Sequence, residues 1–128
     1  MAQWTIDVSD GLLSLRMEGS FSVPEIMAFV VAHNAAVDFF GGAEYRVFCD
    51  IRELRALNPA CGEQFEKAKA HSAGQAGFQG SAVLVSSKIV AMQHQRSSVM
   101  SGVMSTELIS HSEEECRAHL ASVRRTPA

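Results

Sequence analysis

Apolar and polar residues alternate through residues 4–18, which is the pattern of strands with one buried face. Trp4, Ile6 and Val8 alternate with polar neighbours before Asp10-Gly11, and the apolar residues of 13–17 alternate in the same way after it. Asp-Gly favours a two-residue hairpin turn, because both central positions of that turn want positive φ. The pattern predicts a β-hairpin with one apolar face and one face in water.

The pattern then changes to helical spacing. Ser22-Val23-Pro24-Glu25 has the form of a capping box, and apolar residues recur every three or four positions up to Gly41-Gly42. The next apolar run, residues 45–51, is short and rich in strand-forming residues, as expected for a strand buried on both faces. We therefore expect a helix that ends at the glycines, followed by a central strand.

Asn58-Pro59 marks the start of another helix, because asparagine is a good N-cap and proline suits the first helical position. This helix is expected to run to about Ser72, with Phe65 and Ala68 facing inward. Residues 81–85 then predict a second short apolar strand.

The last third of the chain predicts a helix, a strand and a helix. Ser86-Ser87 caps the first helix, which ends near Gly102 and carries apolar residues at helical spacing, namely Ile89, Met92, Val99 and Met100. Residues 106–110 predict the last strand. Ser112-Glu113-Glu114-Glu115 predicts a capping box with acids at the positive end of a helix whose inner stripe is Cys116, Leu120 and Val123.

The expected order is β-β-α-β-α-β-α-β-α, which fills residues 1–128 as a single domain, with 122–128 as a flexible tail. A hairpin followed by alternating strands and helices indicates an α/β fold, with a mixed five-stranded sheet packed by four helices. The hairpin can leave an exposed edge strand, which would suit a homodimer contact.

Composition narrows the class of protein. The chain has 128 residues, of which 47% are apolar and 20% charged, so it is expected to bury a core. Its net charge of −3 argues against a nucleic-acid binder or a binder of anionic membranes. No apolar run approaches the roughly 20 residues of a membrane span, and no basic segment precedes an apolar one near the start. We expect a cytoplasmic protein.

The candidate chemistry is sparse. Cys49, Cys61 and Cys116 are widely spaced, and no two of the five histidines are spaced i, i+4, so we expect no metal and no cofactor. Gly-x-Gly-x-x-Gly, the phosphate-binding loop and the Gly-x-Ser-x-Gly elbow do not occur. We therefore expect no catalytic residues and no enzymatic activity.

Three residues have two interpretations each. Asp50 and Arg52 stand at the carboxyl end of the central strand, where they could contact a ligand or simply pair and cap the loop. Cys61 lies in the first turn of a helix, a place that lowers a thiol pKa, or it is a buried, inert thiol.

The element order resembles the STAS, or SpoIIAA-like, fold. Phe48-Cys49-Asp50-Ile51-Arg52 resembles the Asp-x-Arg strand end of stand-alone bacterial STAS-like proteins, and residues 112–120 resemble their final helix. Anti-sigma-factor antagonists of this fold open their second helix with Asp-Ser-Ser/Thr-Gly-Leu and are phosphorylated on its serine. Here Pro59 and Ala60 occupy the serine positions, so that switch cannot operate in the same way.

The resemblance implies a non-enzymatic protein-interaction or regulatory module. Its partner surface would combine the central strand end with two helix starts, whose free N–H groups suit an acidic or phosphate group. The candidate residues are Asp50, Arg52, Asn58, Pro59, Cys61, Ser86, Ser87 and Lys88.

Two alternatives stay open. One is a pocket for a small apolar ligand or lipid, suggested by Met92, Met100 and Met104 along one helix, although methionines at helical spacing also fill cores. The other is an enzyme that uses Cys61 or a serine, for which no base or oxyanion donor is marked.

Overall fold

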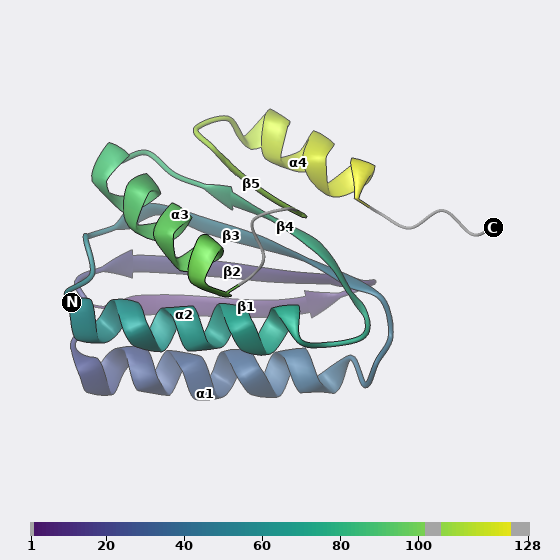
Figure 1. Cartoon of the computed structure of the whole chain (residues 1–128), viewed down its shortest axis with the longest axis horizontal. Coiled ribbons are helices and arrows are strands. Elements are labelled where there is room, and N and C mark those ends of the chain that lie inside the picture. The colour runs from purple at the N-terminus through teal and green to yellow at the C-terminus, as the bar shows by residue number, and fades with distance from the viewer. Residues whose placement is uncertain (1, 102–105, 124–128) are drawn as a thin grey trace.

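The computed structural model describes residues 2–101 and 106–123. Within these residues the elements follow the predicted order (Figure 1). They are β1 (Gln3–Ser9), β2 (Leu12–Gly19), α1 (Val23–Phe39), β3 (Tyr45–Leu54), α2 (Pro59–Ala73), β4 (Phe78–Leu84), α3 (Lys88–Ser101), β5 (Glu107–Ser110) and α4 (Glu113–Ser122). The mixed five-stranded α/β sheet is therefore confirmed. The predicted helix end at Gly102 and residues 124–128 of the predicted tail lie outside the described residues. The predicted start of the tail at 122 is wrong, because Ser122 belongs to α4 and Val123 caps that helix with a backbone bond to His119.

The five strands lie in the order β1-β2-β3-β4-β5. The β1–β2 pair is antiparallel and the other three pairs are parallel, so β2 to β5 all end at one edge of the sheet. Helices α1, α2 and α3 lie on one face and α4 on the other (Figure 1). The larger core lies beneath α1 and α2, and a smaller core joins Phe48 and Leu84 to Cys116 and Leu120 of α4.

Local hydrogen bonds explain where most helices begin. The Ser22 hydroxyl accepts from the Glu25 amide at 3.3 Å and the Glu25 carboxylate accepts from the Ser22 amide at 2.9 Å, which confirms the capping box. The Asn58 side chain accepts from the Cys61 amide at 2.8 Å, with Pro59 in the first helical position. These caps satisfy amides that a helix start leaves without partners.

The cap of α4 is only half of the predicted box. Ser112 accepts from the Glu115 amide at 3.2 Å, but the Glu115 carboxylate accepts instead from the Ser110 hydroxyl at 2.8 Å. Ser110 in turn accepts from the Ser112 amide at 3.0 Å. The carboxylate therefore ties α4 to the end of β5 and does not close the box.

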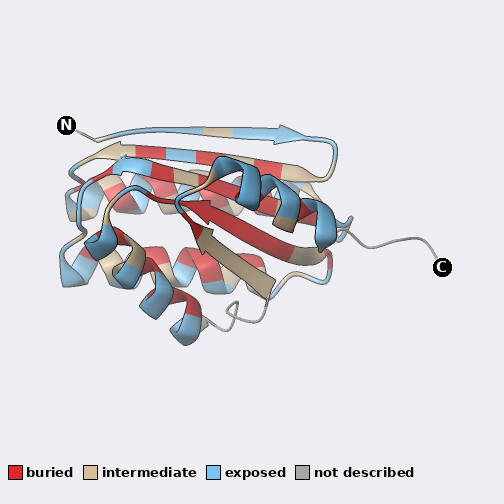
Figure 2. Ribbon diagram, turned by 90° about the horizontal axis from the view of Figure 1, so that it is seen from above, coloured by how far each residue is buried: buried red, intermediate tan, exposed pale blue. Residues whose placement is uncertain are grey.

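The hairpin differs from the prediction in two respects. Gly11 has a φ of 61°, but no described non-glycine residue has positive φ, so Asp10 does not adopt the expected turn conformation. Strand β1 is also mostly exposed, and its apolar face is only partly covered (Figure 2). Trp4 and Val8 remain 36% and 40% exposed, although Trp4 packs edge-on against Phe29 of α1. At the sheet edge, β1 has a neighbour on one side only.

No described helix is long and apolar enough to cross a membrane.

Candidate functional site

Asp50 and Arg52 form a local ion pair. The Arg52 guanidinium donates to both Asp50 oxygens at 3.1 and 2.8 Å, and the Arg52 amide donates to one of them at 3.1 Å. Burial opposes ionisation of Asp50, but these bonds hold its pKa below the usual value. Asp50 shares the α4 side of the sheet with Phe48, two residues earlier on β3. This geometry fits the interpretation in which Asp50 and Arg52 pair with each other and cap the loop.

The start of α2 lies on the opposite side of the sheet. Cys61 is fully buried, and its thiol donates to the Phe21 carbonyl at 3.4 Å. Burial raises the pKa of this thiol, which opposes formation of the reactive thiolate. The buried, inert interpretation of Cys61 therefore fits the structure, and Cys49 and Cys116 are buried free thiols as well.

Ser86 and Ser87 lie between β4 and α3, and Lys88 is the first residue of α3. The Ser86 hydroxyl donates to the Arg52 carbonyl at 2.6 Å, and the Ser87 hydroxyl accepts from the Val90 amide at 3.3 Å as the cap of α3. Lys88 is exposed. The structure thus brings Ser86 next to Arg52. Asp50 lies on the α4 side of the sheet, whereas Asn58 and Pro59 lie on the opposite side.

A groove of about 550 Å³ opens between the start of α2 and α3. Asn58 and Pro59 line it at one end. There the Gln93 side chain of α3 bonds the backbone of Leu57 twice: it accepts from the amide at 3.0 Å and donates to the carbonyl at 2.8 Å. These two bonds link α3 to the β3–α2 loop.

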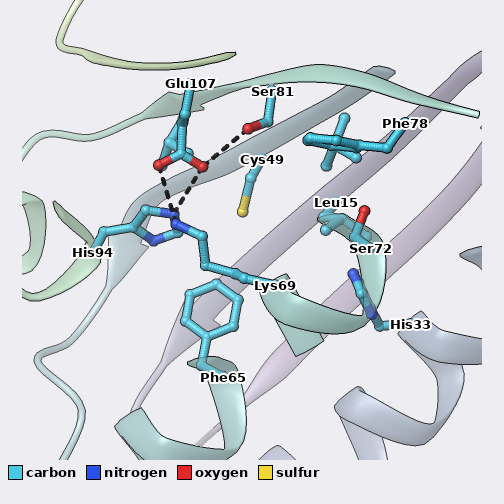
Figure 3. A pocket seen from close by; sticks show the side chains of 12 residues that line it. Leu15, His33, Cys49, Phe65, Lys69, Ser72, Phe78, Ser81, His94 and Glu107 are labelled. Carbon is cyan, nitrogen blue, oxygen red and sulfur yellow. Dashed lines mark hydrogen bonds and ion pairs between the residues drawn. The ribbon is translucent and has the colours of Figure 1, made fainter. Parts of the chain in front are cut away.

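A buried polar cluster that was not predicted from the sequence lies behind the groove (Figure 3). The Lys69 ammonium of α2 lies 3.0 Å from the Glu107 carboxylate of β5, with their side chains 9% and 3% exposed. The Ser81 hydroxyl donates to the same carboxylate at 3.0 Å, and the Ser98 hydroxyl of α3 bonds both charged groups. The cluster thus links four elements, α2, β4, α3 and β5, beneath the surface.

His94 of α3 completes this cluster without a hydrogen bond among the described residues. Its Nε2 lies 3.8 Å from Glu107, and its ring packs edge-on against Phe65 at 5.1 Å. Burial and the nearby Lys69 charge lower the His94 pKa, so its ring is neutral. Burial favours a protonated Glu107, yet the Lys69 charge and the hydrogen bond from Ser98 help to lower its pKa to about 2. His94 also lines the groove.

Helix α3 buries several polar residues and exposes several apolar ones, although Val90 is buried and Arg96 is exposed as well. Its inward positions include His94, Ser97 and Ser98. Its outward residues are Ile89, Met92, Val99 and Met100, between 54% and 65% exposed, and we call them the α3 face. The interpretation of Met92 and Met100 as core residues is therefore wrong, because the inward side of α3 must meet the Lys69–Glu107 cluster. Met104 lies outside the described residues.

No group of three or more histidine, cysteine, aspartate or glutamate side chains in the described part of the chain could hold a metal ion. No family model matches the sequence, and no curated protein matches it. Among solved structures, the fold is similar to that of an anti-sigma factor antagonist from Mycobacterium paratuberculosis. The TM-score is 0.65 at 12% identity, over 94% of this chain and 95% of that one. The chain therefore shares the fold of that anti-sigma factor antagonist, the STAS fold.

Proposed function

We propose that this chain is a cytoplasmic, non-enzymatic regulatory module that binds a protein partner through the α3 face. The observation that carries the proposal is the exposure of Ile89, Met92, Val99 and Met100 along one helix. Contiguous exposed apolar patches on soluble domains commonly mark interaction sites. The helix cannot bury them by rotating, because its inward side is bonded to the Lys69–Glu107 cluster.

Charge narrows the chemistry of the partner. Helix α3 carries Lys88 and Arg96, both exposed, and no acidic residue between Lys88 and Ser101. Arg96 lies between Met92 and Met100 in a row spaced by four, so a complementary surface would be apolar with an acidic group opposite Arg96, because potentials across an interface are matched in sign. The similar structure is by its name an antagonist of an anti-sigma factor, which supports a regulatory protein as the partner.

The start of α2 argues against a phosphorylation switch in this module. Pro59 and Ala60 open the helix and carry no hydroxyl, and the Cys61 amide is already bonded to Asn58. We therefore propose that phosphorylation at the start of α2 does not regulate binding at the α3 face.

Site-specific photo-cross-linking tests the proposal. A p-benzoylphenylalanine at position 92 is expected to capture one protein in cells of the native host. The same group at the exposed position 114 of α4 serves as the matched control and is expected to capture none. Absence of a specific product at 92, or the same product at both positions, would contradict the assignment of the α3 face.

The groove supports a second candidate function, the binding of a small amphipathic molecule. Its inner wall holds His94, which has no hydrogen bond within the described residues, while Leu54, Leu57 and Val90 supply apolar surface. Its volume falls in the usual range of about 300–1,000 Å³ for ligand sites. The neutral imidazole suits a hydroxyl group better than a carboxylate, because burying an ion beside it would need a countercharge.

NMR titration with 4-propylphenol tests this second candidate. We expect saturable shifts at Leu57, Val90 and Gln93 and at the His94 ring nitrogens. A Cβ at Gly62 would meet no atom within 4 Å, and Gly62 lines the groove, so Gly62→Leu should block binding while Gly62→Ala preserves it. Shifts that fail to saturate, or that survive Gly62→Leu unchanged, would exclude the groove as the site.

A further inference from the structure

Helix α1 is apolar on its outward side as well as its inward side. Its inward residues include Ile26, Phe29 and Val37. Its outward side carries a second row spaced every four residues, Met27, Val31, Ala35 and Phe39, in which the three large residues are 49%, 72% and 78% exposed. We call this row the α1 stripe. A helix that is hydrophobic all round is normally covered on both sides.

The charges of α1 lie only near its two ends, and both already have partners. Glu25 closes the capping box with Ser22, and Asp38 pairs with His71 of α2 at 2.8 Å. The polar residues between them, His33 and Asn34, bond each other at 2.8 Å. The α1 stripe therefore offers a partner no ion to recognise, unlike the α3 face with its two cations.

The stripe is complementary to itself. Met27 and Phe39 lie six residues on either side of position 33, and Val31 and Ala35 lie two residues on either side of it. Two copies of α1 packed antiparallel about a twofold axis at position 33 would set Met27 against Phe39 and Val31 against Ala35. The small Ala35 leaves room for Val31, and packed helices lie about 8–10 Å apart. Antiparallel packing also opposes the two helix dipoles favourably.

We propose that the α1 stripe is the contact between two copies of this chain, which form a twofold-symmetric dimer with α1 antiparallel to α1. Helix α1 lies at the outer margin of the helical layer, where a second copy can approach it (Figure 1). A membrane surface fits less well, because interfacial helices are rich in lysine and arginine and α1 has neither. A single helix pair lies below the roughly 1,200–2,000 Å² of a standard interface, so the dimer should be weak and dependent on concentration.

Sedimentation velocity measures the association. We expect a monomer–dimer equilibrium at micromolar to millimolar chain concentration. Val31→Glu should weaken it by about 100-fold, which corresponds to about 2.8 kcal/mol, because each interface would bury two unpaired carboxylates. Val31 is largely exposed in the monomer, so the variant should fold, as thermal melting by circular dichroism will show. Ala121→Glu, at an exposed position of α4, is the matched control and should leave the equilibrium unchanged.

Mixed cysteine cross-linking fixes the geometry. The antiparallel register predicts that Val31→Cys chains form disulfides with Ala35→Cys chains faster than either variant does with itself. The native cysteines are buried and should not interfere. A purely monomeric chain at millimolar concentration, a dimer that tolerates Val31→Glu, or preferential cross-linking between identical positions would each overturn the proposal. These measurements do not involve the α3 face. A result that contradicts the dimer would therefore not contradict the proposed partner binding.

Discussion

Lys69 and Glu107 are charged side chains with almost no access to water, and they lie 3.0 Å apart. The free energy needed to remove two ions from water offsets much of the free energy of their attraction, so the pair need not add net stability. Each ion nevertheless depends on the other, because a lone buried charge has no compensation. The pair therefore fixes the arrangement of α2, α3 and β5 more than it strengthens the fold.

Removing one member of this pair should be costly. Lys69→Met is expected to lower the free energy of unfolding by about 3–5 kcal/mol, because Glu107 would remain buried without a countercharge. The double variant Lys69→Met/Glu107→Leu should recover most of that loss. Urea unfolding measures both, with Lys67→Met, an exposed site on the same helix, as the control. Equal losses in the single and double variants would contradict the role of the pair.

The buried histidines should make the protein sensitive to mild acid. Burial lowers the pKa of His33 and His94 from 6.5 in the folded state, so the unfolded chain binds more protons as the pH falls below that value. Stability should therefore decrease from pH 7.5 to pH 5. Below about pH 4.5, Glu107 adds to the loss, because its folded pKa is about 2. Urea unfolding across this range tests the trend, which His94→Phe should weaken and a flat profile would refute.

At the scale of elements, the order of strands and helices could be predicted because each boundary carries a local signal. Ser22, Asn58 and Ser112 cap helices through their own side chains, and strand patterns need only neighbouring residues. The inward side of α3 could not be predicted in this way. Its polar residues face Lys69 and Glu107, which come from two other elements, and only the tertiary structure brings these together.

A local sign of the buried cluster was nevertheless present. Lys69 follows Phe65 by four residues, and Val90, His94 and Ser98 are also spaced by four, so each row shares one side of its helix. The apolar row on the other side of α3 masked this spacing. The candidate residues at strand ends and helix starts could be identified because the sequence pattern marks such positions. Their separation across the sheet could not be predicted, because it depends on which side of β3 each residue occupies.

Two glycines provide a test of packing within and between elements. A Cβ at Gly62 in α2 would meet nothing within 4 Å, so Gly62→Ala should raise stability by about 0.5–1 kcal/mol through helix propensity. A Cβ at Gly77 would lie 2.0 Å from the Ala43 carbonyl oxygen, so Gly77→Ala should destabilise. The melting temperatures of the two variants, each compared with that of the unmodified chain, test both expectations. Shifts of the same sign would contradict the described backbone.

At the scale of the whole molecule, one layer of helices presents two unlike surfaces. The α3 face shares its side of the helix with two cations, Lys88 and Arg96, whereas the α1 stripe is uncharged and self-complementary. Partner binding and dimer formation would thus use separate helices, and a dimer would carry two partner sites. We expect the Val31→Glu monomer to bind one partner per chain with unchanged affinity. Light scattering of the complex at low concentration measures this stoichiometry, and a variant that loses the partner together with the dimer would show that the two surfaces are not independent.

The affinity of the captured partner for charge variants of the α3 face tests the central claim most directly. Isothermal titration should show that Met92→Glu weakens binding at least about tenfold, or about 1.4 kcal/mol, while Glu114→Lys on α4 leaves it unchanged. Both positions are exposed, so neither variant should alter the melting temperature. Unchanged affinity in Met92→Glu, with the fold intact, would contradict the assignment of α3 as the partner-binding surface.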